Sequence, residues 1–159
     1  MMTHPAEKAG LFYSARAGIG WIIAILSRIP DSLIAVIGRF SIAAVFWLSG
    51  QTKIEGFAID LVQGQFSLGI PRLSDNAVAL FQDEYALPLL SPVLAATLAA
   101  TAEHVFPVLL LLGLATRFSA LALLGMTVVI QILVYPGAYA THGVWATVLL
   151  FLIAKGPGT

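Results

Sequence analysis

Four apolar segments of this chain are each close to the roughly 20 residues that a helix needs to cross the hydrocarbon core of a bilayer. Asp31 or Ser32 is the expected cap at the beginning of the first segment. The fourth segment is the shortest, because its uninterrupted apolar part covers only residues 144–154, and it must therefore include the turn around His142 to span. The expected spans are residues 32–50, 90–115, 118–135 and 138–154.

Composition supports a membrane domain and excludes several classes of function. The chain is 59% hydrophobic and only 10% charged, whereas about a quarter of the residues in an ordinary soluble domain are charged. The formal net charge is zero and no basic run is present, so nucleic acid is not an expected partner. The absence of cysteine excludes disulfide exchange, thiolate-bound metals and iron–sulfur clusters. The sequence therefore predicts an all-α, multi-pass, integral-membrane four-helix bundle.

Loop charges predict the orientation of the bundle. The long loop at residues 51–89 contains two cations and five acids, and cytoplasmic loops are enriched in Lys and Arg. The long loop is therefore expected outside, with both termini in the cytoplasm. The cations on the expected cytoplasmic side are Lys8, Arg16, Arg28, Arg117 and Lys155.

Two segments outside the spans have helical periodicity. Residues 11–28 predict an amphipathic helix on the membrane surface with Trp21 as an interfacial anchor; an appendage packed on the bundle is the open alternative. In the long loop, a short amphipathic helix begins at a capping Ser74 or Asp75 and is expected to cover the outer mouth of the bundle. The expected division is a cytoplasmic or interfacial segment at 1–31 and a four-span domain at 32–155.

Glu103 is an ionisable residue deep within the second expected span, about 20 Å from its outer end. Such residues usually face a partner, a cavity or a pathway. Arg39, about 10 Å into the first span from the cytoplasmic side, is the expected partner in a structural ion pair. The alternatives are that Arg39 extends to the inner interface, or that these residues have a direct function as a proton carrier or as an anchor for a headgroup. His104 lies about 100° further around the helix and is expected to be a core residue that faces elsewhere.

Other polar residues gather towards the outer side, where Gln131 and His142 are expected to hydrogen-bond across the third and fourth spans. His104 and His142 lie at different depths, which argues against a bis-histidine haem, and no metal site is expected. The expected intramembrane polar site comprises Arg39, Glu103, His104 and Gln131, and the expected outer-side polar cluster comprises Lys53, Tyr135 and His142.

The segments "RFSIAAVFWLSGQTKIEGF" and "LLLLGLATRFSALALLGM", with the glutamate in the second span, resemble the DoxX family of small four-helix bacterial inner-membrane proteins. More narrowly, "FQDEYALPLL", "AEHVFP" and "YPGAYATHGVWA" resemble DoxX-like proteins encoded beside multinuclear-iron oxidases that modify metal-binding peptides. The resemblance implies a bacterial inner (plasma) membrane location and a role in membrane redox complexes, and it supplies no catalytic residue. The family pattern falls on Arg39, Gly50, Lys53, Glu103, Gly113 and Arg117, and the subgroup pattern on His104, Pro107, Gln131, Pro136, His142 and Trp145.

The resemblance and the polar residues together favour a membrane accessory subunit, rather than a self-contained enzyme, that links a membrane or soluble oxidoreductase to the quinone pool. A quinone is then the candidate ligand, and no covalently bound cofactor is expected. The alternative is a non-enzymatic scaffold or small-molecule transporter in which an Arg39–Glu103 pair holds the bundle together. Small residues on the spans would allow close contacts within or between copies in a homo-oligomer: Gly38, Ser41, Gly113, Ala120 and Gly125.

Overall fold

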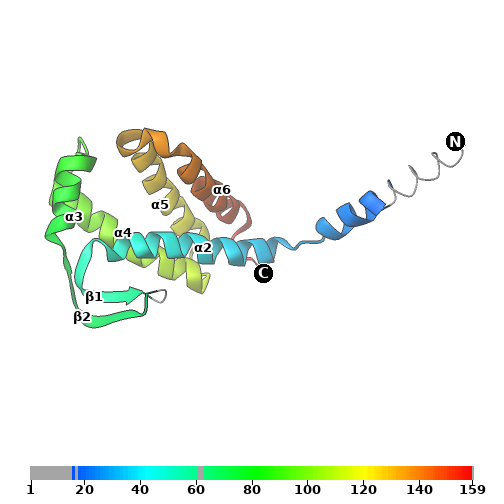
Figure 1. Cartoon of the computed structure of the whole chain (residues 1–159), viewed down its shortest axis with the longest axis horizontal. Helices are drawn as coiled ribbons and strands as arrows, with labels where there is room; N and C mark the ends of the chain where they lie inside the picture. The colour runs from blue at the N-terminus through cyan, green and yellow to red at the C-terminus, as the bar shows by residue number, and fades with distance from the viewer. Residues whose placement is uncertain (1–15, 17, 61–62, 159) are drawn as a thin grey trace, which may run out of the picture.

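A computed structural model describes residues 16, 18–60 and 63–158 of the chain. The described part contains four helices that are long and apolar enough to cross a membrane, which confirms the expected number of spans. The third span ends in a π-helical segment, and a short 3-10 turn precedes the fourth. The spans are α2 (Asp31–Gln51), α4 (Pro92–Leu112), α5 (Thr116–Val129) with its π continuation η2 (Ile130–Val134), and α6 (Tyr139–Lys155) after the turn η3 (Pro136–Ala138) (Figure 1).

The beginning of α2 differs from the expected cap. Pro30 occupies the N-cap position, and no side chain there accepts a hydrogen bond from the helix, so the expectation that Asp31 or Ser32 caps α2 is wrong. The Asp31 carboxylate instead lies 2.6 Å from the Lys155 ammonium. This exposed ion pair joins the beginning of α2 to the end of α6.

The four spans enclose one apolar core, and each exposes large apolar side chains on its other face. α2 packs mainly against α4, and α5 packs against α6. Small residues at these contacts allow helices to approach closely without a hydrophobic driving force in lipid. The fully buried core residues are Ala35 and Ala43 on α2, Leu110 on α4, Ala120 and Leu123 on α5, and Leu149 and Leu152 on α6.

The loop between α2 and α4 contains a β-hairpin that the sequence analysis missed. Its strands are β1 (Ile54–Asp60) and β2 (Gln65–Leu73), which pair antiparallel. The short helix expected after it is confirmed as α3 (Asp75–Leu80), which continues as a π-helical segment, η1 (Phe81–Tyr85). Ser74 is its N-cap, as expected, and its hydroxyl accepts a hydrogen bond from the Ala77 amide at 3.1 Å.

The hairpin folds back along the bundle instead of projecting away from it (Figure 1). The Trp47 indole donates a hydrogen bond to the Ile59 carbonyl at 2.9 Å, and the Ile59 amide donates one to Gln51 Oε1 at 2.8 Å. Both bonds attach the end of β1, close to the tip of the hairpin, to the last turns of α2. We call the end of the bundle that contains the hairpin, α3 and η1 the hairpin end, and the opposite end, with the α4–α5 turn, the Arg117 end.

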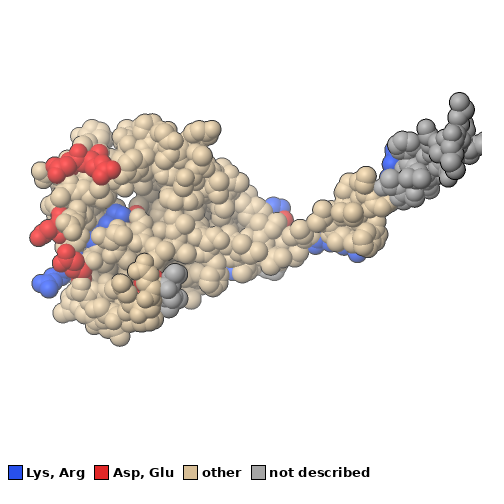
Figure 2. All heavy atoms as spheres, viewed as in Figure 1, with Lys and Arg blue, Asp and Glu red and all other residues tan. Residues whose placement is uncertain are grey.

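Acidic side chains gather at the hairpin end (Figure 2), where Glu55, Asp75 and Glu84 lie on the hairpin, α3 and η1. The described N-terminal residues 18–26 are helical, and their side chains are exposed, with the helix extending away from the bundle (Figure 1). For these residues the alternative of packing on the bundle is therefore wrong. The remainder of the expected helix at 11–28 lies partly outside the described residues. Its position on a membrane surface and the orientation of the termini stay predictions.

Candidate functional site

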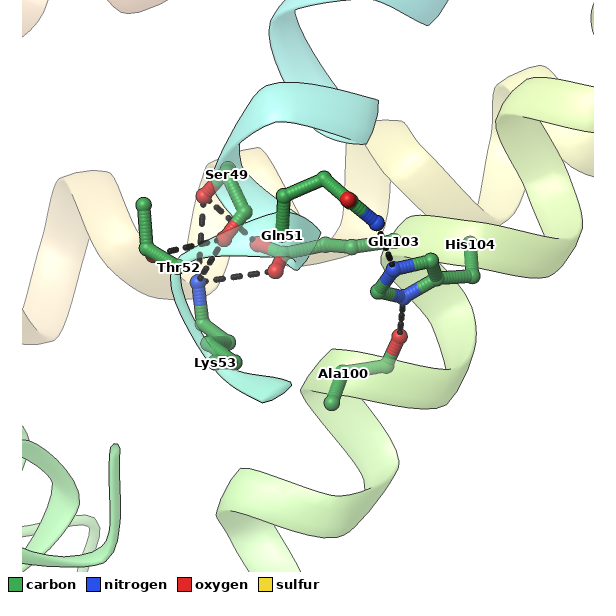
Figure 3. A network of polar contacts seen from close by, with 7 residues as sticks. All are labelled: Ser49, Gln51, Thr52, Lys53, Ala100, Glu103 and His104. Atoms are coloured by element: carbon green, nitrogen blue, oxygen red, sulfur yellow. Dashed lines mark hydrogen bonds and ion pairs between the residues drawn. The ribbon is translucent and has the colours of Figure 1, made fainter. Parts of the chain in front are cut away.

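A buried ion pair joins α4 to the segment just after α2 (Figure 3). The Lys53 ammonium lies 2.7 Å from Glu103 Oε2, and the two side chains are only 4% and 3% exposed. Lys53 also donates to the Ser49 carbonyl at 3.2 Å and to the Ser49 hydroxyl at 3.0 Å. The Ser49 hydroxyl in turn donates to Glu103 Oε1 at 3.1 Å. The three donors of the ammonium and both oxygens of the carboxylate therefore have partners within one small network.

The expected Arg39–Glu103 pair is wrong. Arg39 donates instead to the Leu110 carbonyl at 3.5 Å, close to the end of α4. Glu103 lies seven positions before Leu110 in the sequence, or about 10 Å along the helix. Arg39 and Glu103 would be at similar depth only if the beginning of α2 and the end of α4 lay at the same height in the membrane. In the structure the two helices are staggered, so that Glu103 is level with Ser49 in the last turn of α2 and with Lys53 just after it.

Gly50 marks the closest approach of α2 to the polar part of α4. A Cβ atom at Gly50 would lie 2.8 Å from the His104 Cε1 atom and 3.0 Å from the Glu103 Cβ atom. Both separations are shorter than a normal contact between carbon atoms. Because Gly50 has no side chain, the side chains of Glu103 and His104 have room to lie against α2 at this position.

His104 faces away from Glu103, as expected from the helix geometry. Its Nδ1 atom lies 2.6 Å from the Ala100 carbonyl, and its Nε2 atom lies 2.8 Å from Gln51 Nε2. The bond from the Ile59 amide to Gln51 Oε1 fixes the orientation of the Gln51 side chain, so its NH₂ group faces the ring. Because a carbonyl only accepts, the neutral imidazole carries its proton on Nδ1 and accepts from Gln51 at Nε2.

The expected hydrogen bond between Gln131 and His142 is confirmed, with Gln131 Oε1 2.7 Å from His142 Nδ1. The Gln131 amide donates to the Pro136 carbonyl at 2.7 Å, so its oxygen is free to accept from the imidazole. His142 is buried and packs against Trp145, with 5.1 Å between ring centroids. Gln131 therefore belongs with His142 at the hairpin end of α5 and α6. Its expected grouping with Glu103 and His104 stays a prediction.

Tyr135 also has a partner that the sequence analysis did not identify. Its hydroxyl donates a short hydrogen bond to Glu84 Oε1, which connects the end of η2 to η1. This bond is the main reason that the pKa of Tyr135 is raised to about 12, with a smaller contribution from burial. The ring of Tyr85 lies edge-on to Tyr135 at 5.9 Å. Burial, with added repulsion from Glu103 and then Glu84, raises the pKa of the Tyr85 hydroxyl.

The two adjacent polar residues of α4 face two different cavities. The first, which we call the interspan cavity, has a volume of about 320 Å³, and Lys53, Glu103 and Tyr85 are on its wall. Its other walls are apolar and come mainly from α4, α5 and η1, including Phe81, Leu98, Phe106, Met126 and Ile130. The second, which we call the hairpin groove, has a volume of about 780 Å³ and lies between the hairpin and the helices α2 and α4. His104 and Trp47 are on its wall.

Metal chemistry has no obvious location within the part of the chain that the structure describes. No three His, Asp or Glu side chains there lie close enough together to hold a metal ion. The described polar groups form pairs and short hydrogen-bonded chains instead.

The fold and the site define a multi-pass helical membrane protein with a charged pair buried between its spans. The chain belongs to the DoxX family, whose family model matches residues 34–136, from the first span to the end of the third. This is a membrane-protein family often linked to redox processes, and the match confirms the resemblance to the family. No curated protein and no solved structure matches the chain.

Proposed function

We propose that this chain is an accessory subunit of a membrane redox system, which binds a quinone in the interspan cavity and links a partner oxidoreductase to the quinone pool of a bacterial inner membrane. The observation that carries the proposal is the Lys53–Glu103 pair, which is buried at the level of the spans and opens onto an apolar cavity. Ionisable residues within membrane spans are costly and usually serve a pathway or a ligand.

The cavity fits the head of a quinone in size and chemistry. Small-molecule sites typically measure about 300–1,000 Å³ and combine apolar walls with a few polar groups, and the interspan cavity measures about 320 Å³. Phe106 and Met126 offer apolar surface for the ring, and the Lys53 ammonium and Tyr85 hydroxyl are donors for its carbonyl oxygens. When bound, a quinone supplies an acceptor for two electrons and two protons.

The charged pair would both orient a carbonyl group and hold a proton. Lys53 now donates to Glu103 and Ser49, so a ligand carbonyl would replace one of these acceptors. Glu103 is the carboxylate on the cavity wall, and its Oε2 atom can accept a proton once the ammonium turns towards the ligand. The Ser49 hydroxyl would keep the other oxygen, Oε1, in place.

The second candidate function is a non-enzymatic scaffold or small-molecule transporter. It is favoured by the completeness of the network among Lys53, Ser49 and Glu103, which leaves no donor of the ammonium free. In this case the pair only holds α2 against α4. Replacement of Glu103 separates the two candidates, because only the redox function uses its proton.

Direct quinone binding is the test of the proposal. The purified protein in detergent would be equilibrated with a short-chain ubiquinone analogue, and co-extracted quinones would be identified. Ala122→Leu places extra bulk on the wall of the interspan cavity and should weaken binding by about tenfold or more. Gly125→Leu is the matched control on the same helix, since a side chain there points into open space, and it should leave binding unchanged. Equal binding by both variants would contradict a quinone site in this cavity.

The variant Glu103→Gln then tests whether Glu103 takes part in proton transfer. We expect the folded variant to lose quinone-linked turnover when it is reconstituted with its partner and membranes. Unchanged turnover in a stable variant would exclude a proton role for Glu103 and favour the scaffold. The resemblance of three segments to proteins encoded beside multinuclear-iron oxidases makes such an oxidase the first partner to test.

The proposed orientation places the hairpin end outside the cytoplasm and both termini inside. It is supported by the acidic side chains at the hairpin end (Figure 2) and by the cations at the Arg117 end. The natural absence of cysteine allows a direct test. A membrane-impermeant maleimide should label Asn76→Cys, an exposed position on α3, in intact cells and should label Ala154→Cys only after lysis, and the opposite pattern would reverse the orientation.

A further inference from the structure

The apolar face of the hairpin is turned towards the bundle but does not pack on it. Phe57 pairs with Leu68, and Ile59 pairs with Phe66, so these four side chains share one face of the two-stranded sheet. Phe66 is nevertheless 66% exposed and Leu68 is 82% exposed. The uncovered face needs an apolar partner.

The opposite wall of the hairpin groove is formed by α4. Val105 and Val108 line it and are themselves exposed, although they face Phe57 and Leu68 across the groove. Two apolar surfaces at the level of the membrane spans thus line a groove with a volume of about 780 Å³. A long, flexible apolar chain between them would cover both surfaces together.

The groove becomes polar towards the hairpin end. Leu68 lines the groove near the middle of β2, and Arg72 lines it at the end of the strand that leads to α3. On the α4 side, Thr97 also lines the groove, and it precedes Val108 by eleven residues, or about 16 Å of helix. A cation therefore lies at the end of the groove nearer the membrane boundary, and the apolar part extends towards the middle of the bilayer.

This gradient has the polarity of a lipid in one leaflet, with a phosphate at the boundary and an acyl chain directed inwards. Arg72 is exposed, and although Glu55 is its partner in the strand register, no ion pair joins Arg72 to Glu55 or to any other residue that the structure describes, so its guanidinium can turn to a phosphate. A lipid chain in the groove would also shield the backbone of the hairpin, because open sheet edges are not tolerated in contact with hydrocarbon.

We propose that the hairpin groove binds one anionic phospholipid of the surrounding bilayer, with its phosphate at Arg72 and an acyl chain between Leu68 and Val108. The site is separate from the interspan cavity, which lies on the other side of α4, and it does not depend on quinone binding. The hairpin holds the lipid against the bundle through the bonds of Ile59 to Trp47 and Gln51.

Trp47 provides a probe, because its indole lines the groove. Trp21→Phe with Trp145→Phe leaves Trp47 as the single tryptophan of the chain. The protein would be reconstituted in phosphatidylcholine vesicles with a minor fraction of either phosphatidylglycerol or phosphatidylcholine that carries brominated acyl chains, which quench tryptophan on contact. We expect brominated phosphatidylglycerol to occupy the groove about fivefold more readily at equal fraction, the preference that one arginine near a membrane surface provides.

Arg72→Gln should abolish this preference, and Arg72→Lys, which retains the charge, should preserve it. Arg117→Gln is the control at the opposite end of the bundle and should also preserve it. Equal quenching by the two brominated lipids, or an unchanged preference in Arg72→Gln, would overturn the proposal. Relief of the quenching by a short-chain ubiquinone analogue would also overturn it, because the groove would then hold the quinone.

Discussion

Lys53 and Glu103 are fifty positions apart in the sequence, and their charged groups meet 2.7 Å apart in an almost fully buried contact. Lys53 lies two residues beyond the end of α2, so the pair closes the junction between this span and α4. Burial of two charges is expensive, and their attraction offsets the cost only when both are well hydrogen-bonded. The Ser49 hydroxyl and carbonyl provide those additional bonds.

Removal of one charge should therefore cost much more than removal of both. Glu103→Gln or Lys53→Gln alone leaves an unpaired buried charge and should lower the free energy of unfolding by about 3 kcal/mol. The double variant Lys53→Gln with Glu103→Gln should recover most of this loss. Unfolding in mixed micelles of detergent and dodecyl sulfate measures all three. A double variant as unstable as the sum of the single variants would contradict the pairing.

The spans were predictable because about twenty consecutive apolar residues have few alternatives to a membrane helix. The hairpin was not, because the apolar residues of its strands occupy both faces: Ile54 and Ala58 alternate with Phe57 and Ile59 in β1. No period of two is visible in such a strand. A register shift at Gly56, whose φ of 84° favours glycine, interrupts the pattern further.

The site was predictable only in part, since the depth of a residue along its own helix does not fix the stagger between two helices. The depth of Glu103 along its own span identifies it as a buried acid that needs a cation, but Arg39 would be that cation only if the ends of the two helices were aligned. The sequence places Lys53 at the outer end of the first span and Glu103 deep in the second. Because α4 extends well beyond the end of α2, Glu103 is nevertheless level with Lys53. The bond between Gln131 and His142 was predictable because both residues lie close to the same turn.

The corrected pairing predicts that Arg39 and Glu103 act independently. Arg39 donates to the Leu110 carbonyl at the end of α4, which also accepts a hydrogen bond from the Gly113 amide at 3.0 Å. Arg39→Met should thus cost about 1 kcal/mol. In a double-mutant cycle with Glu103→Gln, the two losses should add to within about 0.5 kcal/mol. A coupling energy between Arg39 and Glu103 as large as that between Lys53 and Glu103 would instead support the Arg39–Glu103 ion pair that the sequence predicts.

Gly50 should not tolerate any side chain, because a Cβ atom there would displace Glu103 and His104. We expect Gly50→Ala to lower the free energy of unfolding by about 1–3 kcal/mol, the usual cost of overpacking. Gly125→Ala is the control, since its Cβ atom would meet nothing within 4 Å, and it should be neutral or slightly stabilising because alanine favours the helix. Equal effects of the two substitutions would show that α2 and α4 are not in close contact at Gly50.

The bond between Tyr135 and Glu84 should be visible as a tyrosine that titrates late. Ionisation of Tyr135 would remove the proton that its hydroxyl donates to the Glu84 carboxylate, and the loss of this hydrogen bond is the main reason that its pKa lies at about 12 instead of the ordinary 10.0. Glu84→Gln should move this pKa back towards the ordinary value. A spectrophotometric titration of tyrosinate measures the shift, and Tyr135→Phe identifies which transition belongs to Tyr135.

The same bond makes the attachment of η1 to η2 sensitive to alkaline pH. Because the pKa is raised in the folded protein, the stabilisation is fully present below about pH 10 and is lost as the pH rises through about 12. The alkaline unfolding of the natural protein should therefore become steeper in this interval than that of Glu84→Gln. Coincident alkaline profiles, or a Tyr135 transition that stays near 12 in Glu84→Gln, would show that the carboxylate does not accept this hydrogen bond.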